Sequence, residues 1–108
     1  MTVKERQEVI TELFNEVSEV LFNKGQAYAV NNDCFSTFKV GEKYGTTKYQ
    51  TWGAFFEKHV ASIQVAIKEN PQFPVEKTES MKGRIQDAIA YLGILHAMLV
   101  NDELEKKI

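Results

Sequence analysis

The residues best suited to chemistry lie in one segment near the end of the chain, ESMKGRIQDAIAYL, which spans residues 79–92. Four polar side chains follow one another there at spacings of four, three and four residues, in the order Ser80, Arg84, Asp87 and Tyr91. These spacings place all four on one side of a helix, beside its apolar stripe. A guanidinium can bind an anionic oxygen, a carboxylate can accept a hydrogen bond or hold a metal, and a tyrosine can stack or donate.

A structural explanation of this polar stripe stands beside the functional one. Arg84 and Asp87 can pair with each other at a seam between two helices. Ion pairs of this kind are common and contribute little to stability when they are exposed. The two explanations differ in whether the stripe forms a wall of a ligand site or only fills a seam.

A second polar cluster consists of Glu57, Lys58 and His59. Glu57 is expected to flank the apolar stripe of its helix, Lys58 to lie on a more polar side, and His59 to lie nearly on the stripe. Glu57 and Lys58 can line a ligand site or form a solvated face. A lone histidine at the edge of a core is usually satisfied by one hydrogen bond. Since no cysteine or histidine stands at zinc-ligand spacing, we expect no zinc site.

A third cluster combines basic, aromatic and amide groups in an irregular segment. Its members are Lys24, Tyr28, Asn32, Asp33, Phe35 and Phe38. Rings can stack on a nucleobase and lysine can pair with a phosphate, so the cluster suits a nucleotide. For Phe35 and Phe38 we favour the alternative that they fill the core, whereas for Tyr28, Asn32 and Asp33 both readings stay open.

The usual signatures of phosphate-binding loops and of nucleophilic catalysis are missing from the sequence. It contains neither G-x-x-x-x-G-K-[ST] nor G-x-G-x-x-G, and it has no nucleophile elbow. The single cysteine, Cys34, has no histidine near it in the sequence. We therefore expect Cys34 to be a small buried apolar group.

Length and composition predict one ordinary globular domain spanning residues 1–108. The formal net charge of -2 argues against a nucleic-acid partner, which usually requires a strongly basic surface. One cysteine suits a reducing compartment, and the sequence shows neither a signal peptide nor an apolar run long enough to cross a bilayer. We therefore expect a cytoplasmic protein with no membrane contact.

Apolar residues recur at helical spacing in three long segments, and no segment alternates like a strand. The sequence therefore predicts an all-α fold, a compact bundle of three long helices and one short helix. The long helices are expected from Thr2 to between 24 and 30, from Thr46 or Thr47 to 70, and from about 78 to 101, with a charged tail at 102–108. The core stripe of the last helix is expected to be Met81, Ile85, Ala88, Leu92, Leu95 and Leu99.

Four motifs occur along the chain in a recognisable order. They are K-x-x-x-Y (Lys24 and Tyr28), D-C-F-S-T-F (33–38), W-G-A-F-F-E-K-H (52–59) and E-S-M-K-G-R-I-Q-D-A-I-A-Y-L (79–92). Over about residues 20–100 this pattern resembles small phage and prophage proteins described as nucleotide modification associated, or MazG-like. The resemblance implies an all-α MazG-like fold. Active members of that superfamily are nucleoside triphosphate pyrophosphohydrolases that hold Mg²⁺ with an E-x-x-E on one helix and an E-x-x-D on the next.

The sequence departs from that carboxylate pattern at two positions. Asp87 matches its last carboxylate and Glu57 its first glutamate, but Arg84 and Val60 stand where the other two are expected. Glu79 supplies a third carboxylate only if it reaches in. One or two carboxylates can still hold Mg²⁺ together with substrate phosphates. The departures therefore argue against catalysis more than against nucleotide binding.

Three functions follow from these patterns. The first is a small phage-type protein that binds and sequesters a nucleotide or a nucleotide-derived signal, without catalysis and without a cofactor. Its expected ligand-binding residues are Lys24, Tyr28, Asp33, Glu57, Lys58, Arg84, Asp87 and Tyr91. The alternative is a Mg²⁺-dependent nucleoside triphosphate pyrophosphohydrolase with Glu57 and Asp87 as metal ligands.

The third function is a helical interaction module, in which the polar stripe that contains Arg84 forms the seam of a dimer. In all three cases we expect a homo-oligomer. If the protein is phage-encoded, it is expected in the host cytoplasm.

Overall fold

The computed structural model describes residues 1–29 and 32–106, with the side chains of 26–28 outside that description. The described chain contains three long α-helices, α1 (Val3–Tyr28), α2 (Lys48–Glu69) and α3 (Met81–Lys106). Two 3-10 helices, η1 (Ser36–Lys39) and η2 (Glu42–Tyr44), replace the one short helix expected between α1 and α2. No strand occurs among the described residues, so the all-α prediction is confirmed.

Two of the long helices begin at capping boxes that the sequence encodes. Thr2 accepts a hydrogen bond from the Glu5 amide, and Glu5 accepts one from the Thr2 amide. Thr47 and Gln50 form the same pair of bonds at the start of α2. Each box satisfies two backbone donors that have no partner within the helix, which fixes where the helix starts.

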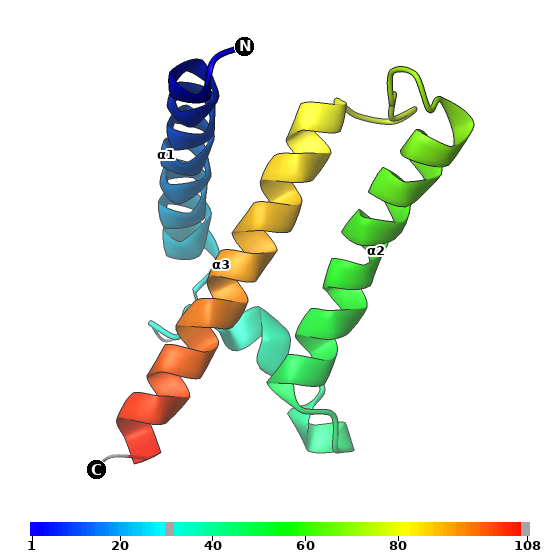
Figure 1. Cartoon of the computed structure of the whole chain (residues 1–108). Coiled ribbons are helices and arrows are strands. Elements are labelled where there is room, and N and C mark those ends of the chain that lie inside the picture. Colours follow the sequence, from blue (N-terminus) through cyan, green and yellow to red (C-terminus); the bar gives the residue numbers. More distant parts are fainter. Residues whose placement is uncertain (30–31, 107–108) are drawn as a thin grey trace.

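Helices α2 and α3 lie side by side and antiparallel, joined by the segment 70–80 (Figure 1). Their seam holds the core cluster of Phe38, Trp52 and Met98. The Trp52 indole N–H donates to the Tyr91 carbonyl oxygen at 2.7 Å. Phe38, which η1 carries, packs edge-on against Phe55 of α2 and Tyr91 of α3, with ring centroids 6.0 and 6.2 Å apart. The prediction that Phe38 fills the core is confirmed.

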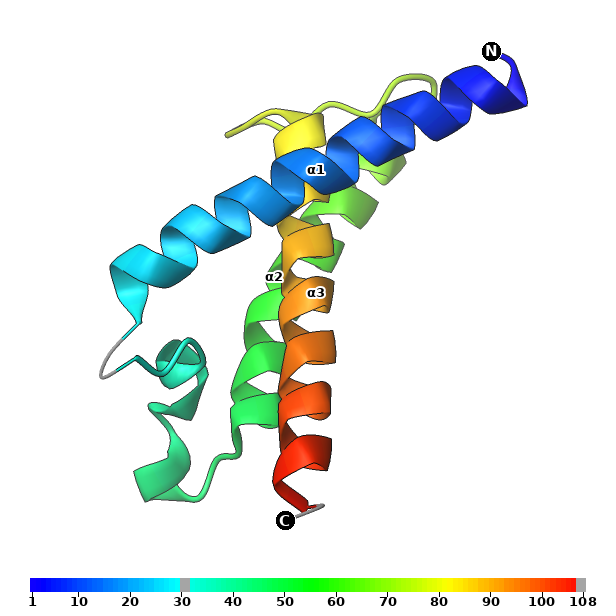
Figure 2. The same ribbon diagram turned by 90° about the vertical axis from the view of Figure 1, so that its left-hand side faces the viewer.

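Helix α1 crosses α3 instead of lying parallel to the α2–α3 hairpin (Figure 2). Val17 is buried, and Gln86 of α3 donates to Glu16 of α1 at 2.7 Å. The first half of α1 projects beyond the hairpin and leaves nearly all its side chains exposed.

The chain is therefore not the compact bundle that the sequence suggested. Its radius of gyration is 16.4 Å, whereas a folded domain of this length has about 13 Å. The crossing of α1 is the physical reason, because a helix whose first half projects beyond its neighbours cannot close a bundle around a common core.

The core stripe expected for α3 is also wrong in part. Ile85, Leu92 and Leu99 are exposed, because α3 turns the neighbouring side of the helix, with Tyr91 and Met98, towards α2.

The charged residues from 102 to 106 belong to α3 and do not form a separate tail, while 107 and 108 lie outside the described residues. Asp102 accepts hydrogen bonds from Lys48 Nζ at 2.6 Å and from the Tyr49 hydroxyl at 2.5 Å. These bonds hold the end of α3 to the start of α2 and lower the pKa of Asp102. The hydrogen bond to Asp102 is also the main reason why the pKa of Tyr49 is raised to about 12. No described helix is both long and apolar enough to span a lipid bilayer.

The core makes a stability prediction at Met98, whose side chain is fully buried. Met98→Ala should lower the free energy of unfolding by about 2–4 kcal/mol, because it removes buried apolar atoms and leaves a cavity. Leu104→Ala, on the same helix at an exposed position, should change it by less than about 0.5 kcal/mol. Urea unfolding followed by circular dichroism measures both, and equal effects would contradict this account of the core.

Candidate functional site

A cavity lies between the end of α1, the segment 34–38 and the middle of α3, and we refer to it as the α1–α3 cavity. Its volume is about 400 Å³. Lys24 lines it from α1, and Asp87 and Tyr91 line it from α3. The segment around η1 contributes Cys34 and Phe35. Three of the residues expected to bind a ligand therefore reach one cavity from two helices.

The two charged residues of this cavity have opposite signs and stay apart. Lys24 is exposed and Asp87 is half-buried. Within the described part of the chain neither forms an ion pair or a side-chain hydrogen bond. Burial first, and the nearby Asp87 charge second, raise the pKa of Tyr91. The cavity thus offers a cation, an anion and a neutral phenol that are not committed to one another.

The position of Tyr91 is fixed by aromatic groups of α2 and η1. Its ring lies 4.8 Å from the His59 ring and 6.2 Å from the Phe38 ring, measured between centroids. Its backbone carbonyl accepts the Trp52 hydrogen bond. Because packing holds the ring from several sides, Tyr91 presents a preorganised surface to the cavity.

Arg84 is committed to protein groups and does not line the cavity. Its guanidinium donates to His59 Nδ1 at 3.0 Å and to Glu76 Oε2 at 3.3 Å. Its Nε lies 3.3 Å from Glu79 Oε1 without the alignment of a hydrogen bond. Since arginine only donates, this bond uses Nδ1 of His59 as its acceptor. Only 14% of the Arg84 side chain is exposed. Through its bonds to His59 and Glu76, Arg84 connects the start of α3 to α2 and to the segment 70–80.

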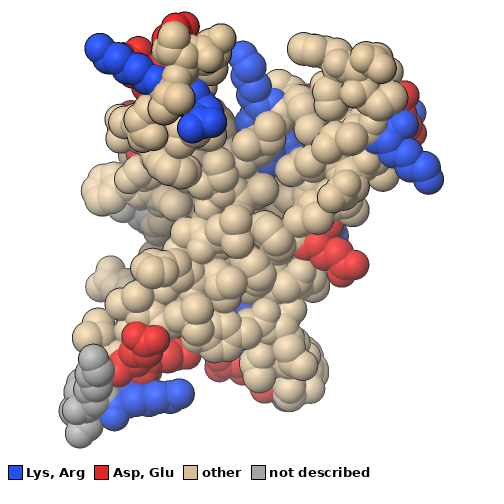
Figure 3. All heavy atoms as spheres, in the orientation of Figure 1, with Lys and Arg blue, Asp and Glu red and all other residues tan. Residues whose placement is uncertain are grey.

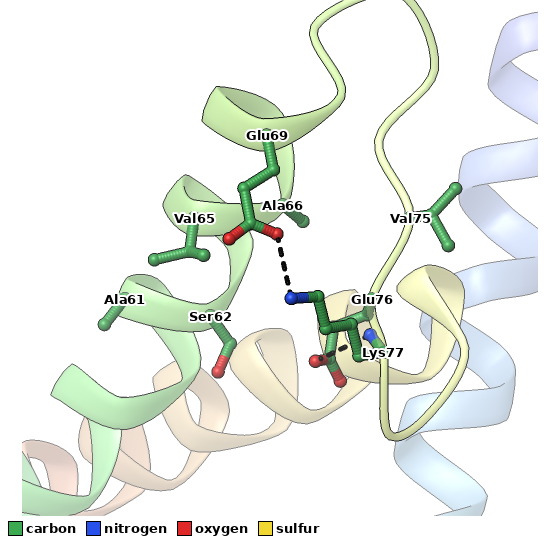
Figure 4. A pocket seen from close by; sticks show the side chains of 8 residues that line it. All are labelled: Ala61, Ser62, Val65, Ala66, Glu69, Val75, Glu76 and Lys77. Atoms are coloured by element: carbon green, nitrogen blue, oxygen red, sulfur yellow. Dashed lines mark hydrogen bonds and ion pairs between the residues drawn. The ribbon is translucent and has the colours of Figure 1, made fainter.

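The segment 70–80 is held by a second set of charges, which border a smaller hollow of about 240 Å³ against α2 (Figure 4). Lys77 Nζ lies 3.6 Å from Glu69 Oε2 across this hollow. Burial works against the ionised form of Glu76, but hydrogen bonds from Arg84 and Thr78 outweigh it and lower the pKa of Glu76. Lys77 pairs with Glu69, and Glu76 pairs with Arg84. Because these charges already have partners, this hollow is a weaker candidate for a ligand site than the α1–α3 cavity.

The remaining predicted residues lie elsewhere or are engaged. Glu57 and Lys58 are exposed on α2, and neither lines the α1–α3 cavity. Glu57 follows Trp52 by five residues, which places it about 140° round the helix from the side that meets α3. Asp33 pairs with Lys39 at 2.7 Å, and this bond is the main reason why the pKa of Asp33 is lowered. The side chain of Tyr28 lies outside the described residues.

Sequence reasoning missed the apolar wall of the cavity and misplaced Cys34. Ile94 and Ala97 line the cavity on α3 beside Asp87 and Tyr91. Ile94 follows Tyr91 by three residues and Ala97 follows Ile94 by three, so both continue the same stripe, a signal that could have identified them. Cys34 is exposed and lines the cavity, contrary to the expectation that it is buried.

The residues proposed as metal ligands do not form a metal centre. Among residues 1–29 and 32–106, no three or more His, Cys, Asp or Glu side chains lie close enough together to hold a metal ion. Asp87 faces the α1–α3 cavity, whereas Glu57 lies on a part of α2 turned away from α3. The donor set of the described residues therefore does not fit the Mg²⁺ site that the MazG-like resemblance implies.

Comparisons with protein-family models, with curated proteins and with solved structures found no match to this chain.

The lowered pKa values of Glu76 and Asp102 predict how stability depends on pH. Both carboxylates ionise more readily in the fold, so their ionised forms stabilise it above their ordinary pKa values of 4.5 and 3.8. That contribution is lost as the pH falls through the lowered pKa values. The double variant Glu76→Gln/Asp102→Asn should therefore have a lower thermal unfolding midpoint than the wild type at pH 7, and the difference should shrink as the pH approaches about 3.

The matched control is Glu8→Gln/Glu19→Gln, which changes two exposed glutamates of α1. Its midpoint should follow the wild type across the same pH range. A difference between the wild type and Glu76→Gln/Asp102→Asn that stays constant with pH would show that these carboxylates do not act through their charge.

Proposed function

We propose that this protein binds a nucleotide-like small molecule in the α1–α3 cavity and leaves it chemically unchanged. The observation that carries the proposal is that Lys24, Asp87 and Tyr91 line one cavity from two helices. Neither charge is neutralised by an ion pair within the described chain. Asp87 is half-buried, and a carboxylate that loses water without gaining a partner costs free energy, so this residue is more useful to a ligand than to the fold.

The lining of the cavity matches a ligand with a ring and an anionic group. Its volume of about 400 Å³ lies within the usual range for small-molecule sites. Phe35 and Tyr91 provide ring surfaces on which a base can stack, and most of the remaining wall is apolar. Lys24 is exposed at the same cavity and suits a phosphate, while the Asp87 carboxylate suits the amino or hydroxyl groups of a base or sugar.

The biological role we propose is sequestration of a nucleotide or of a nucleotide-derived signal. The support is the resemblance of the motifs at 24–28, 33–38, 52–59 and 79–92 to small phage and prophage MazG-like proteins. Three long helices with a short irregular segment between the first two are compatible with that fold. Under this proposal the protein acts in the cytoplasm, which is the host cytoplasm if it is phage-encoded, and it needs no cofactor.

The pyrophosphohydrolase alternative receives less support from the geometry. It requires Glu57 and Asp87 to share one Mg²⁺, but the two residues border different surfaces of the chain. Arg84 and Val60 hold the positions of the other two carboxylates in the MazG-like pattern, and Arg84 is bound to Glu76 and His59. The arrangement therefore favours a binder over an enzyme.

Calorimetric titration with a panel of nucleoside mono-, di- and triphosphates and cyclic nucleotides tests the proposal. At least one should bind, and Lys24→Gln should weaken its binding about tenfold, because a charge-assisted bond to phosphate is lost. Lys58→Gln is the matched control, since this exposed lysine lies on α2 and does not line the cavity.

Chromatography of the ligand recovered after incubation with protein and Mg²⁺ separates binder from enzyme. Unchanged ligand supports the proposal, and released pyrophosphate supports the enzyme alternative. Equal losses in Lys24→Gln and Lys58→Gln, or no binding across the panel, would rule out the α1–α3 cavity as the nucleotide site.

A further inference from the structure

The outer side of the α2–α3 hairpin carries an apolar stripe that the chain itself does not cover. On α3, Ile85, Leu92 and Leu99 are 37%, 48% and 47% exposed and follow one another at intervals of seven residues. On α2, Val60 and Ile67 are 37% and 43% exposed at the same interval. Residues seven apart lie on one side of a helix, so each helix contributes one continuous row.

The two rows lie on the same side of the hairpin, away from η1, and we call this surface the hairpin face. On α2, Val60 follows Phe55 by five residues and so lies about 140° from the side that meets η1. On α3, Leu92 is one residue beyond Tyr91, which contacts Phe38 of η1. Figure 3 views the molecule from the side opposite η1, and the middle of the surface there shows little positive or negative charge.

The chain exposes more surface than is usual for a folded monomer of its mass. A folded monomer of 12.4 kDa exposes about 6,100 Å², whereas this chain exposes 8370 Å². The excess of about 2,200 Å² lies in the range that each partner of an obligate homodimer buries, about 1,000–2,500 Å². The radius of gyration is likewise large, 16.4 Å against the value of about 13 Å usual for this length.

The first half of α1 projects on the same side of the hairpin as the hairpin face. In Figure 2, η1 and η2 lie on one side of the hairpin and the first half of α1 projects from the other. This half carries exposed apolar side chains, among them Val9 and Phe14. A molecule seated on the hairpin face would therefore also meet α1, and the two surfaces together account for much of the excess exposed area.

We propose that the hairpin face binds the hairpin face of a second copy of this chain, about a two-fold axis. Two copies then form a four-helix core from their α2 and α3 helices, with α1 of each copy overhanging the other. A nearly uncharged apolar row suits pairing with itself, because a two-fold axis brings like residues together and like charges would repel. In this dimer the seam is the hairpin face and not the polar stripe that contains Arg84, since Arg84 is held inside each hairpin.

The substitution that tests this pairing is Leu92→Glu in the full chain. Each two-fold interface contains the substitution twice, so the dissociation constant measured by analytical ultracentrifugation should rise by about 100-fold or more. The matched control is Val65→Glu, another exposed apolar residue of α2 that lies outside the hairpin face. It should sediment as the wild type does, at twice the chain mass.

Cross-linking keeps the test informative if Leu92→Glu fails to fold. Cys34 is the only cysteine, so Cys34→Ser/Leu92→Cys carries a single thiol on the hairpin face. Mild oxidation should convert it to a covalent dimer, whereas Cys34→Ser/Val65→Cys should stay largely monomeric on a non-reducing gel. Wild-type protein that sediments at 12.4 kDa in the micromolar range, or equal cross-linking at positions 92 and 65, would overturn the proposal.

Discussion

The packing around Tyr91 is the constraint on which the rest of the structure depends. Its backbone carbonyl accepts the Trp52 hydrogen bond that joins α2 to α3, and its ring packs against Phe38 and His59. Burying these rings supplies much of the stabilisation available to a chain with so small a core. The same ring forms part of the α1–α3 cavity. The core and the candidate site therefore share Tyr91, so a movement of this residue would change both.

Placing Tyr91 in the seam determines which sides of α3 face inward. The side with Arg84 and Asp87 becomes half-buried, and the fold resolves the two charges differently. Arg84 is neutralised by Glu76 and Glu79, which removes the cost of burying a guanidinium. Asp87 receives no such partner within the described chain and faces the cavity instead. One polar stripe therefore supplies both a structural ion cluster and a candidate ligand group. For this reason the sequence alone did not decide whether the stripe lines a ligand site or fills a seam.

Local features of the fold could be predicted, because they depend on neighbouring residues. The capping boxes at Thr2 and Thr47 and the long helices follow from short-range patterns. Helical periodicity identified Ile85, Leu92 and Leu99 as part of one apolar row, but it cannot say whether another helix of the same chain covers that row. The crossing of α1 and the capture of Arg84 by Glu76, eight residues away, depend on tertiary packing that no spacing rule encodes.

The two proposals meet at α1, which forms one wall of the cavity and carries Lys24. Within one copy Val17 of this helix is buried, Leu21 lies close to Gly93 and Gln86 donates to Glu16, while its first half projects outward. A second copy on the hairpin face would contact that projecting half and so fix the helix along its length. Because Lys24 moves with α1, pairing would preorganise the cavity, and ligand would favour the paired form in return. Affinity for the ligand should then depend on protein concentration, a linkage that a rigid single-copy site would not show.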